Sequence, residues 1–488
     1  MKSAKRILSL LLATLLLLSL FGCGKKDDEG DGEVVKKTVA NSSDVRLPYS
    51  REDGVNPFSA TSVLNQPLMP LLYEGLYYVD SAYQPHPELA SSATISGGEI
   101  HVVLNHSKRF SDGSPVTGAD VIYSFKKAQK SPYYASALTG FNSIKEESGG
   151  SLTVKLSRYD PYILADLVFP VVKADTAEKA AIPTGSGLYV YSVTDMGGLL
   201  KKNGSAKDSR SDDAAGRKAA SGSFNQIYLL NTNDTSKLMY SLAVGNVNAV
   251  YDDITGGSIT RVRVNYNQVP MNNVIVINLR QKEAMADPKI RQDLSLLLDR
   301  DTLINSGLDG YGVPASLPFN PSWYAAKGLK VKTPAKATAE KEIKEAFQGK
   351  TLSILTDADN PFKVKLADQL QTQLKALGIT TNIASLNYGG YAKGAASGGY
   401  DFIIAEYKLT NSMYFPNMVM SKELKETYED LLVGKATLQT FLNQYQAEMP
   451  FLTVAYRSGL LATSKSLETE PVMLPGDPYA NVWEWKIG

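Results

Sequence analysis

The sequence is poor in the residues that build disulfides and metal sites, with a single cysteine, Cys23, and three histidines in 488 residues. One cysteine excludes a disulfide within the chain and any metal site built from several cysteines. His101 and His106 flank an expected strand at a spacing unsuited to a metal site, and His86 stands apart from them. We therefore expect no metal cluster and no cofactor, although a single axial histidine ligand stays open as an alternative.

The chain also lacks an excess of charge of either sign, with 51 Lys and Arg against 50 Asp and Glu. Lys2, Lys5 and Arg6 precede an apolar N-terminal segment, so 51 minus 3 against 50 leaves the remainder near −2. Without a basic excess the chain cannot neutralise a phosphate backbone, and we expect no nucleic-acid partner. The 43% apolar and 21% charged residues are typical of globular proteins, and the length predicts two or three structural domains.

An apolar run extends from Ile7 to Phe21, directly after the positive charges of Lys2, Lys5 and Arg6. It is too short to cross a bilayer comfortably but fits the apolar region of a signal peptide. The run ends in Leu20-Phe21-Gly22-Cys23, which resembles a bacterial lipobox, where the cysteine thiol takes a diacylglyceryl group. We expect residues 1–22 to be a lipoprotein signal peptide and Cys23 to be lipidated. A stray cysteine beside an ordinary cleavage site is the alternative.

Residues 23–46 are charged, contain glycine and have almost no large apolar side chains. Such a composition predicts a disordered tether, whose reach over about 22 residues is roughly 25 Å. Acyl chains contribute about 0.8 kcal/mol per buried CH₂, so a multiply acylated cysteine would hold the protein on a membrane. We expect a lipid-anchored protein at the outer face of the bacterial cytoplasmic membrane.

The stretch from Phe110 to Phe125, FSDGSPVTGADVIYSF, predicts a strand, a turn and a capped helix. Asp112-Gly113 is a turn pair, and Thr117 stands three residues before Asp120, the spacing of a capping box. Apolar residues then recur at helical spacing, so one face of this helix is expected to pack on the body of the protein.

Together with LYEGL at Leu72–Leu76 and PELA at Pro87–Ala90, this stretch resembles the signature of the family 5 extracellular solute-binding proteins of ABC transporters, the oligopeptide-, dipeptide- and nickel-binding group. Further matches follow in order, among them PTGSGLY at Pro183–Tyr189 and the segment Arg291–Arg300. The resemblance implies a two-lobed periplasmic-binding-protein-like α/β fold of type II, cluster C, with an extra α/β subdomain on the first lobe. It also implies that the chain is no enzyme.

The resemblance further implies how the chain divides. After the signal peptide and tether, the expected parts are a first lobe of 47–63, 184–271 and 451–488, an extra subdomain of 64–183, and a second lobe of 272–450. The lobes would be joined by crossings near 271 and 450. The segment 197–223, rich in Gly, Ser, Ala, Lys and Asp, is expected to be a loop.

In the second lobe, a strand at 352–356, a helix at 362–377 and a strand at 379–386 form a βαβ pattern, which predicts parallel pairing. A single helix is expected over 289–306. The run DFIIAEY at Asp401–Tyr407 is a buried strand that would end at the interlobe cleft, because ligands of open α/β sheets bind beyond the carboxyl ends of the strands. The candidate cleft residues are therefore Glu406, Tyr407, Lys408, Thr410 and Asn411.

In the peptide-binding members of the family, an aspartate three residues after a tryptophan holds the α-ammonium of the peptide. Here Tyr407 stands at the tryptophan position and Thr410 at the aspartate position. A free ammonium would lose its counter-charge, which is costly in a buried site. Arg457 is a candidate for a ligand carboxylate, with a structural arginine as the alternative, and Phe319 of the loop Pro318–Pro321 completes the candidate set.

We therefore expect an extracellular receptor of an ABC importer that captures a small solute, with peptide as the default, and delivers it to a permease and ATPase complex. We expect the receptor to be a monomer. The alternatives are a blocked or modified peptide, an oligosaccharide or a metal chelate as ligand, or a surface lipoprotein that uses the fold for sensing or adhesion.

Two enzyme motifs are incomplete. Ser124–Lys127 contains S-x-x-K, but neither S-D-N nor K-T-G occurs in the chain. Gly349-Lys350-Thr351 ends like a P-loop, but Lys344 stands where that motif needs glycine.

Overall fold

The computed structural model describes residues 43–488 except 180–181, 196, 206–225, 233–236, 256–259, 332–334, 416–417 and 419, and it leaves out the side chains of 179 and 337. The chain divides into the units Met1–Val39 and Ala40–Gly488, and every described residue belongs to the second. The expected signal peptide, Cys23, most of the tether and most of the 197–223 loop lie outside the described residues. Within them, no helix combines the length and the apolar character that a membrane crossing requires.

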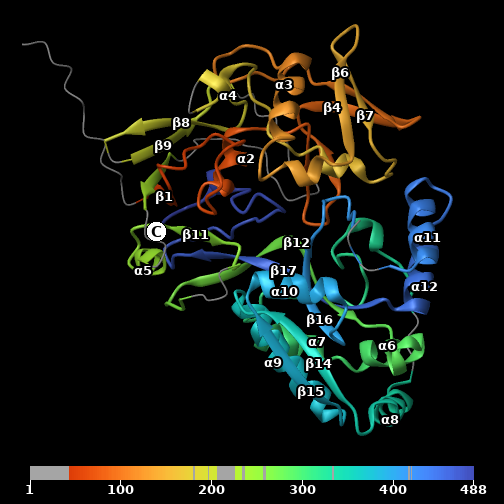
Figure 1. Ribbon diagram of the computed structural model, residues 1–488. Helices are drawn as coiled ribbons and strands as arrows, with labels where there is room; N and C mark the ends of the chain where they lie inside the picture. Colours follow the sequence, from red (N-terminus) through yellow and green to blue (C-terminus); the bar gives the residue numbers. More distant parts are fainter. Residues whose placement is uncertain are drawn as a thin grey trace, which may run out of the picture. The chain divides into compact units, whose positions relative to one another are not determined.

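The largest sheet among the described residues has the strand order β11-β17-β12-β16-β14-β15, with β13 paired to β17 (Figure 1). The bounds are β11 Ala249–Asp252, β12 Asn265–Leu279, β13 Gly312–Pro314, β14 Thr351–Asp357, β15 Thr380–Leu386, β16 Phe402–Lys408 and β17 Phe451–Thr463. Strand β14 is parallel to β15 and β16, which confirms the predicted βαβ pairing around helix α9, Pro361–Ala376.

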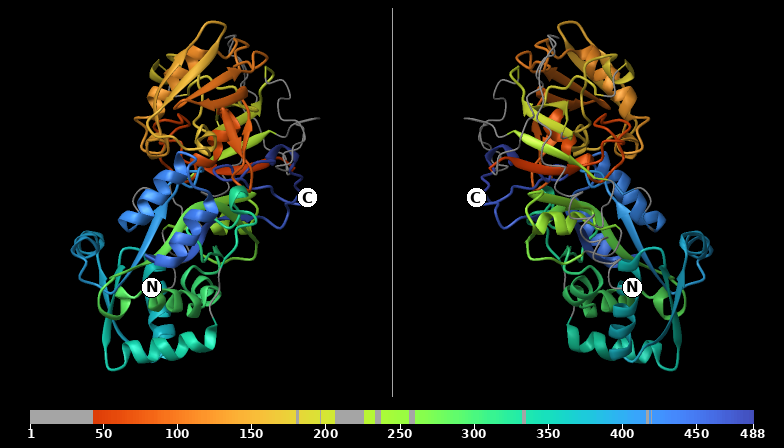
Figure 2. Two further views of the ribbon diagram at one scale, coloured as in Figure 1. Left: turned by 90° about the vertical axis from the view of Figure 1, so that its right-hand side faces the viewer. Right: turned by 90° about the vertical axis from the view of Figure 1, so that its left-hand side faces the viewer.

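Strands β12 and β17 are the longest, with 15 and 13 residues, and pair antiparallel from Asn265 opposite Thr463 to Asn278 opposite Phe451. They contain or adjoin the two crossings expected near 271 and 450, and they can be followed in Figures 1 and 2. The register shifts between Val269 and Asn273. Pro270 lies in this interval and has no N–H to donate to a ladder, which fits an interruption of the pairing there.

Helices cover this sheet and extend from it. Their bounds are α5 Leu238–Ala243, α6 Pro288–Leu297, α7 Arg300–Gly307, α8 Lys336–Phe347, α10 Tyr388–Ser397, α11 Lys422–Leu432 and α12 Leu438–Glu448. The prediction of one helix over 289–306 is wrong, because Leu298 and Asp299 are extended between α6 and α7. The Asp299 carboxylate accepts a hydrogen bond from the Thr302 amide at 3.0 Å, so it caps a new helix instead of continuing the old one.

A second sheet has the order β1-β10-β9-β8, with bounds β1 Val45–Tyr49, β8 Tyr189–Thr194, β9 Gly197–Lys202 and β10 Ile227–Asn231. Strand β1 begins two residues before the expected start of the body, because Val45 is fully buried. The expectation of a loop from 197 is wrong for its first six residues, which form β9. Leu199 and Leu200 are buried there, so apolar burial outweighs the glycines at the start of the strand.

A third sheet, β4-β5-β7-β6, lies within the segment expected to form the extra subdomain, and α3 Gly118–Ala128 packs on β6. Its bounds are β4 Ala90–Ser96, β5 Glu99–Leu104, β6 Phe141–Glu146 and β7 Ser151–Leu156, and smaller elements nearby are α2 Met69–Leu72, β2 Tyr77–Val79, β3 Pro85–Pro87 and α4 Thr176–Lys179. The predicted capping box is confirmed, since the Thr117 amide and hydroxyl both donate to the Asp120 carboxylate. Ser124 of the S-x-x-K motif is fully buried, and its hydroxyl bonds the Val172 backbone.

Buried apolar side chains form two clusters. One draws mainly on residues 45–229 and 467–487, and the other mainly on residues 238–462. Two cores formed by largely different parts of the chain are what a two-lobed protein requires. The individual domain boundaries given above stay predictions.

Candidate functional site

A cavity of about 270 Å³ is lined by residues from segments that are far apart in the sequence. Seven of its lining residues are tyrosines: Tyr73, Tyr77, Tyr78, Tyr83, Tyr133, Tyr134 and Tyr251. Carboxamides come from Gln66, Asn272, Asn273 and Asn411, and the charged residues of the lining are Lys408, Glu88 and Asp477. Aromatic faces with a few polar groups between them are typical of a binding site for a small ligand.

The end of β16 and the interruption in β12 bring the polar side chains of the second lobe to this cavity. The Leu409 amide donates to the Asn272 carbonyl at 2.9 Å, and the Asn272 side chain donates to the Thr410 carbonyl. Lys408, Thr410 and Asn411 therefore line the cavity directly beyond the strand, where the sequence predicts the cleft.

Lys408 presents an ammonium group to the cavity. Its nitrogen lies 5.0 Å from the centroid of the Tyr133 ring, a cation–π distance, and its side chain stays accessible. Among the described residues, no carboxylate oxygen lies within 4.0 Å of this nitrogen. Burial in the site lowers the pKa of Lys408, an effect that the negative charge of Asp253 opposes and the positive charge of Arg457 reinforces.

Glu406 and Arg457 neutralise each other away from the cavity. The Arg457 Nε donates to Glu406 Oε1 at 2.8 Å, and the Asn273 amide donates to the same oxygen at 2.8 Å. The Arg457 guanidinium also donates to the Asp253 carbonyl. Neither Glu406 nor Arg457 belongs to the cavity lining, so the structural role, which was the alternative for Arg457, accounts for its contacts.

Tyr407 and Phe319 also lie outside the lining. Tyr407 points to the face of β16 opposite Glu406 and Lys408, and its hydroxyl accepts a hydrogen bond from the Asn278 side chain at 3.0 Å. Phe319 is 2% exposed and packs against the rings of Trp323, Phe415 and Phe441, at centroid distances of 5.3, 5.7 and 5.6 Å. A direct part in ligand binding for these two residues stays a prediction.

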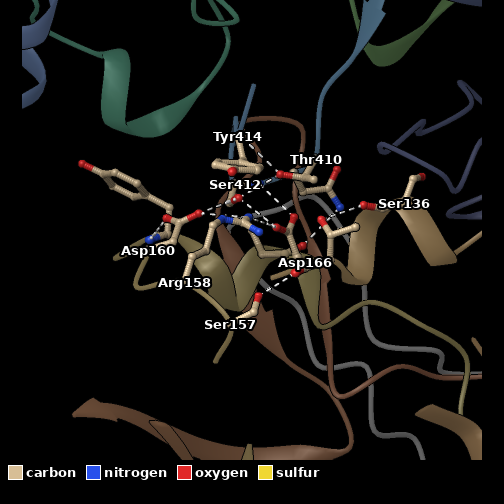
Figure 3. A network of polar contacts seen from close by, with 12 residues as sticks. Ser136, Ser157, Arg158, Asp160, Asp166, Thr410, Ser412 and Tyr414 are labelled. Carbon is tan, nitrogen blue, oxygen red and sulfur yellow. Dashed lines mark hydrogen bonds and ion pairs between the residues drawn. The ribbon is translucent and has the colours of Figure 1, made fainter. Parts of the chain in front are cut away.

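Four residues beyond Lys408, a buried polar network joins the segment after β16 to residues 158–166 (Figure 3). The Ser412 amide donates to Asp166 Oδ1 at 3.0 Å, while its hydroxyl lies 2.8 Å from Asp166 Oδ2 and 3.0 Å from Asp160 Oδ2. Arg158 Nη2 is 3.5 Å from Asp160 and 4.0 Å from Asp166, and its guanidinium lies 3.4 Å above the Tyr414 ring.

Burial away from water is the largest influence on the pKa values of the two aspartates in this network. Burial, followed by the charge of Asp160, raises the pKa of Asp166 to about 7, although the bonds from Ser412 and the charge of Arg158 oppose the shift. Burial raises the pKa of Asp160 as well. The Ser412 hydroxyl has one proton, but it lies near two carboxylate oxygens and can donate to only one of them. If Asp166 is protonated, it can donate to the Ser412 oxygen while the Ser412 hydroxyl donates to Asp160.

Two residues of the cavity lining have a buried side-chain oxygen. Gln66 and Asn273 belong to the lining, but their oxygens Oε1 and Oδ1 are buried and accept no hydrogen bond from the described residues. Buried polar atoms are normally paired, so these two oxygens are exceptions within the described part of the chain. The described residues contain no group of three or more His, Cys, Asp or Glu side chains arranged to hold a metal ion.

Two features of this region were not predicted from the sequence: the seven tyrosines of the cavity lining and the polar network around Arg158. The excess of 27 tyrosines over three tryptophans was a signal for aromatic pocket walls, but it does not say which tyrosines meet. The run Ser157-Arg158-Tyr159-Asp160 puts opposite charges next to each other, yet it contains no sign that its partner is Ser412.

Comparison with known proteins agrees with this architecture. The model of the bacterial extracellular solute-binding proteins, family 5, matches residues 84–422, which is more than half of the chain. The glutathione-binding protein GsiB of Escherichia coli K12 is 22% identical over 355 residues, which cover 69% of this chain and 68% of that protein.

Solved structures of similar fold include the unliganded open form of MppA, a periplasmic murein tripeptide-binding protein, with a TM-score of 0.73, 16% identity and coverage of 91% of this chain and 98% of that one. NikA of Brucella suis, solved with Fe(III)-EDTA, gives a TM-score of 0.66 at 17% identity and covers 91% of this chain and 100% of its own. These likenesses confirm the expected two-lobed periplasmic-binding-protein-like α/β fold.

Members of family 5 are extracytoplasmic, bind small ligands or peptides and work with the permease and ATPase of an ABC transporter. The chain belongs to the bacterial extracellular solute-binding proteins of family 5, and it binds a solute for delivery to such an importer.

Proposed function

We propose that the solute is a short peptide or a peptide-like amide, held in the tyrosine-lined cavity. The observation that carries this proposal is the composition of the lining, in which four carboxamide side chains stand among seven tyrosines, because carboxamides both donate to and accept from peptide groups. A cavity of about 270 Å³ lies near the lower end of the roughly 300–1,000 Å³ of ligand sites, which favours two or three residues over a long peptide. The names of GsiB and MppA, a glutathione and a murein tripeptide binder, agree with this size.

The cavity supports a mechanism of closure, because residues of both cores surround it. Tyr73 and Tyr77 belong to one core and Leu409 to the other. A ligand that contacts both sides gains its full set of contacts only when the lobes are closed, so its binding shifts the equilibrium toward the closed form. The closed form is then the one that docks on the permease.

The test is native mass spectrometry of the full chain, purified in detergent from its own organism, followed by denaturation to identify what is released. We expect peptides of two or three residues. A sugar or a metal chelate would keep the receptor function and replace the ligand class. A protein that carries nothing and shows no thermal shift with peptides, sugars or chelates would favour the sensing or adhesion function.

We also propose that the receptor is a monomeric lipoprotein, anchored through Cys23 at the outer face of the cytoplasmic membrane. The support is the sequence alone: the basic start, the apolar run from Ile7 to Phe21 and the lipobox-like ending. Cys23→Ser is expected to move the protein from the membrane fraction to the soluble fraction. Continued membrane association of this variant would contradict the lipid anchor.

A further inference from the structure

Lys408 is the only basic side chain among the described residues that line the cavity. It comes directly before the loop that joins the two sides of the site, and it lies over the Tyr133 ring at 5.0 Å. An aromatic face attracts an ammonium group without neutralising it, so this contact positions the charge and leaves its three donors available. The cavity thus contains a placed cation that has no counter-ion among the residues that the structure describes.

The carboxylates around Lys408 are engaged elsewhere. Glu406, two residues earlier on the same strand face, is tied to Arg457 and Asn273. The lining itself contains two carboxylates, Glu88 and Asp477, and neither forms an ion pair with Lys408; Glu88 accepts from the Gly75 amide at 3.0 Å. Asp253 affects Lys408 through its field, but its oxygen accepts from the Thr255 amide and it forms no ion pair with the lysine. Within the part of the chain that the structure describes, Lys408 therefore has no carboxylate partner, and a bound ligand can supply one.

At the Thr410 end of the cavity, no carboxylate of the described residues belongs to the lining, whose two acidic residues are Glu88 and Asp477. Thr410, at the position where the resemblance places a carboxylate, shares its hydroxyl with Ser412 Oγ at 2.8 Å and with the Tyr414 amide at 3.3 Å. Asp160 and Asp166, the carboxylates beyond it, have side chains that are 1% exposed and do not line the cavity. A ligand ammonium at this end would meet hydroxyls and carbonyls, but no anion.

We propose that Lys408 is an anion anchor that makes the cavity selective for solutes bearing a carboxylate. This inference rests on the proposed function, since it assigns a charged group of the ligand to a residue of the same site. The carboxylate lies on the Tyr133 side of the cavity, where the Lys408 ammonium is placed. The carboxylate has two possible sources, the C-terminus of a peptide or an acidic side chain.

The experiment uses tripeptide mixtures in four forms, with a free or acetylated amine and with a C-terminal carboxylate or amide, plus an acetylated and amidated mixture whose central residue is Glu. Binding to the wild-type chain is measured by native mass spectrometry, and the strongest binders are titrated by calorimetry. We expect the carboxylate forms to bind about tenfold tighter or more than the amides, as for a hydrogen bond to a charged group. The acetylated forms show whether the ligand amine contributes as well. The Glu mixture distinguishes a side-chain carboxylate from a C-terminal one.

The variants are Lys408→Met, which removes the charge, Lys408→Arg, which keeps it, and Lys425→Met on the exposed face of α11 as the matched control. Lys408→Met is expected to erase the difference between acid and amide without weakening the amide, Lys408→Arg to keep it, and Lys425→Met to change nothing. Melting temperatures check folding, and Lys408→Gln replaces the Met variant if that variant does not fold.

The outcomes separate the two claims. Equal binding of acids and amides by the wild-type chain overturns the anion anchor and leaves the peptide receptor standing. Binding of no tripeptide form overturns the peptide receptor. In that case the same variants are titrated with mixtures of small di- and tricarboxylic acids and sugar acids. Binding that depends on Lys408 then supports the anchor, and no binding overturns it.

Discussion

A basic side chain lies over a tyrosine ring at two sites: Arg158 over Tyr414, and Lys408 over Tyr133. The two sites differ in whether the basic side chain has carboxylate partners. Arg158 lies 3.4 Å above Tyr414 with Asp160 and Asp166 beside it, whereas Lys408 lies 5.0 Å from Tyr133 with no ion pair among the described residues. The Arg158 side chain is 14% exposed and the two aspartates 1%, while Lys408 lines the cavity. The Arg158 site, whose cation is paired with carboxylates, is buried and structural, and we call it the balanced site. The Lys408 site, whose cation has no such partner, lines the cavity and can meet a ligand, and we call it the unbalanced site.

The largest effect is expected from breaking the balanced site. Arg158→Met removes the cation and leaves two buried carboxylates without it, so the free energy of unfolding at pH 8 should fall by about 3 kcal/mol. Urea denaturation measures this change. Lys145→Met, which breaks an exposed pair with Glu147, is the control and should cost less than about 1 kcal/mol. A loss for Arg158→Met no larger than that of the control would remove the network from the stability of the fold.

The next effect is a pH dependence that the balanced site creates. Because the pKa of Asp166 is raised from 3.8 to about 7, the folded chain binds more protons than the unfolded chain between these values. Its contribution to the free energy of unfolding is fully present below pH 3.8 and is lost as the pH rises through about 7, by up to about 1.4 kcal/mol per pH unit.

Asp166→Asn should flatten this slope in urea titrations between pH 5 and pH 8, while Asp368→Asn on the exposed face of α9 should keep it. A slope in Asp166→Asn as steep as in the wild-type chain would assign the titration to another group.

The unbalanced site, at Lys408, should show its pH dependence in ligand binding instead of in stability. A carboxylate ligand needs protonated Lys408, whose pKa is lowered, so affinity should fall as the pH rises through that pKa, by up to about tenfold per unit. The groups facing Lys408 are Tyr133, Asp253 and Arg457. Calorimetry from pH 7.5 to 10.5 tests this, with Lys408→Arg expected to shift the decline to higher pH. An identical decline in both proteins would attribute it to one of the facing groups.

The smallest effect is expected on the far face of the same strand. Tyr407→Phe removes only the hydrogen bond to Asn278, so ligand affinity should stay within about twofold and stability should fall by about 1 kcal/mol. Calorimetry and urea denaturation give the two values. A tenfold loss of affinity would place Tyr407 in the site and contradict the difference between the two faces of β16.

Three residues of the cavity lining were predictable from the sequence because they follow a local pattern. The apolar run before Lys408 is long enough to identify a buried strand, and the rule on strand ends then locates Lys408, Thr410 and Asn411 at the cleft. Because successive side chains of a strand point to opposite faces of the sheet, the sequence also predicts that Glu406 and Tyr407 lie on different faces of β16. The pattern does not contain the partner of each side chain, so the sequence left a ligand carboxylate and a structural role open for Arg457, whose observed partner is Glu406.

The remaining parts of the site depend on contacts between distant segments. Ser412 meets Asp160 across 252 residues, and the seven tyrosines of the cavity come from the segments 73–83, 133–134 and 251. Periodicity reports which side of an element is apolar, but not which other element covers it. The break between α6 and α7 was missed for a different reason, since a helical pattern continues through Leu298 while the Asp299 cap interrupts the backbone.

The shift of register in β12 has a mechanical consequence. Val269 is paired with Gly459 and Asn273 with Arg457, and no residue between Val269 and Asn273 has a partner in β17. A bend of the ribbon at this point breaks no paired position between the two strands, and the Leu409 amide still bonds the Asn272 carbonyl there. Because Pro270, Met271 and Asn272 also line the cavity, a molecule held in it would contact this interval directly.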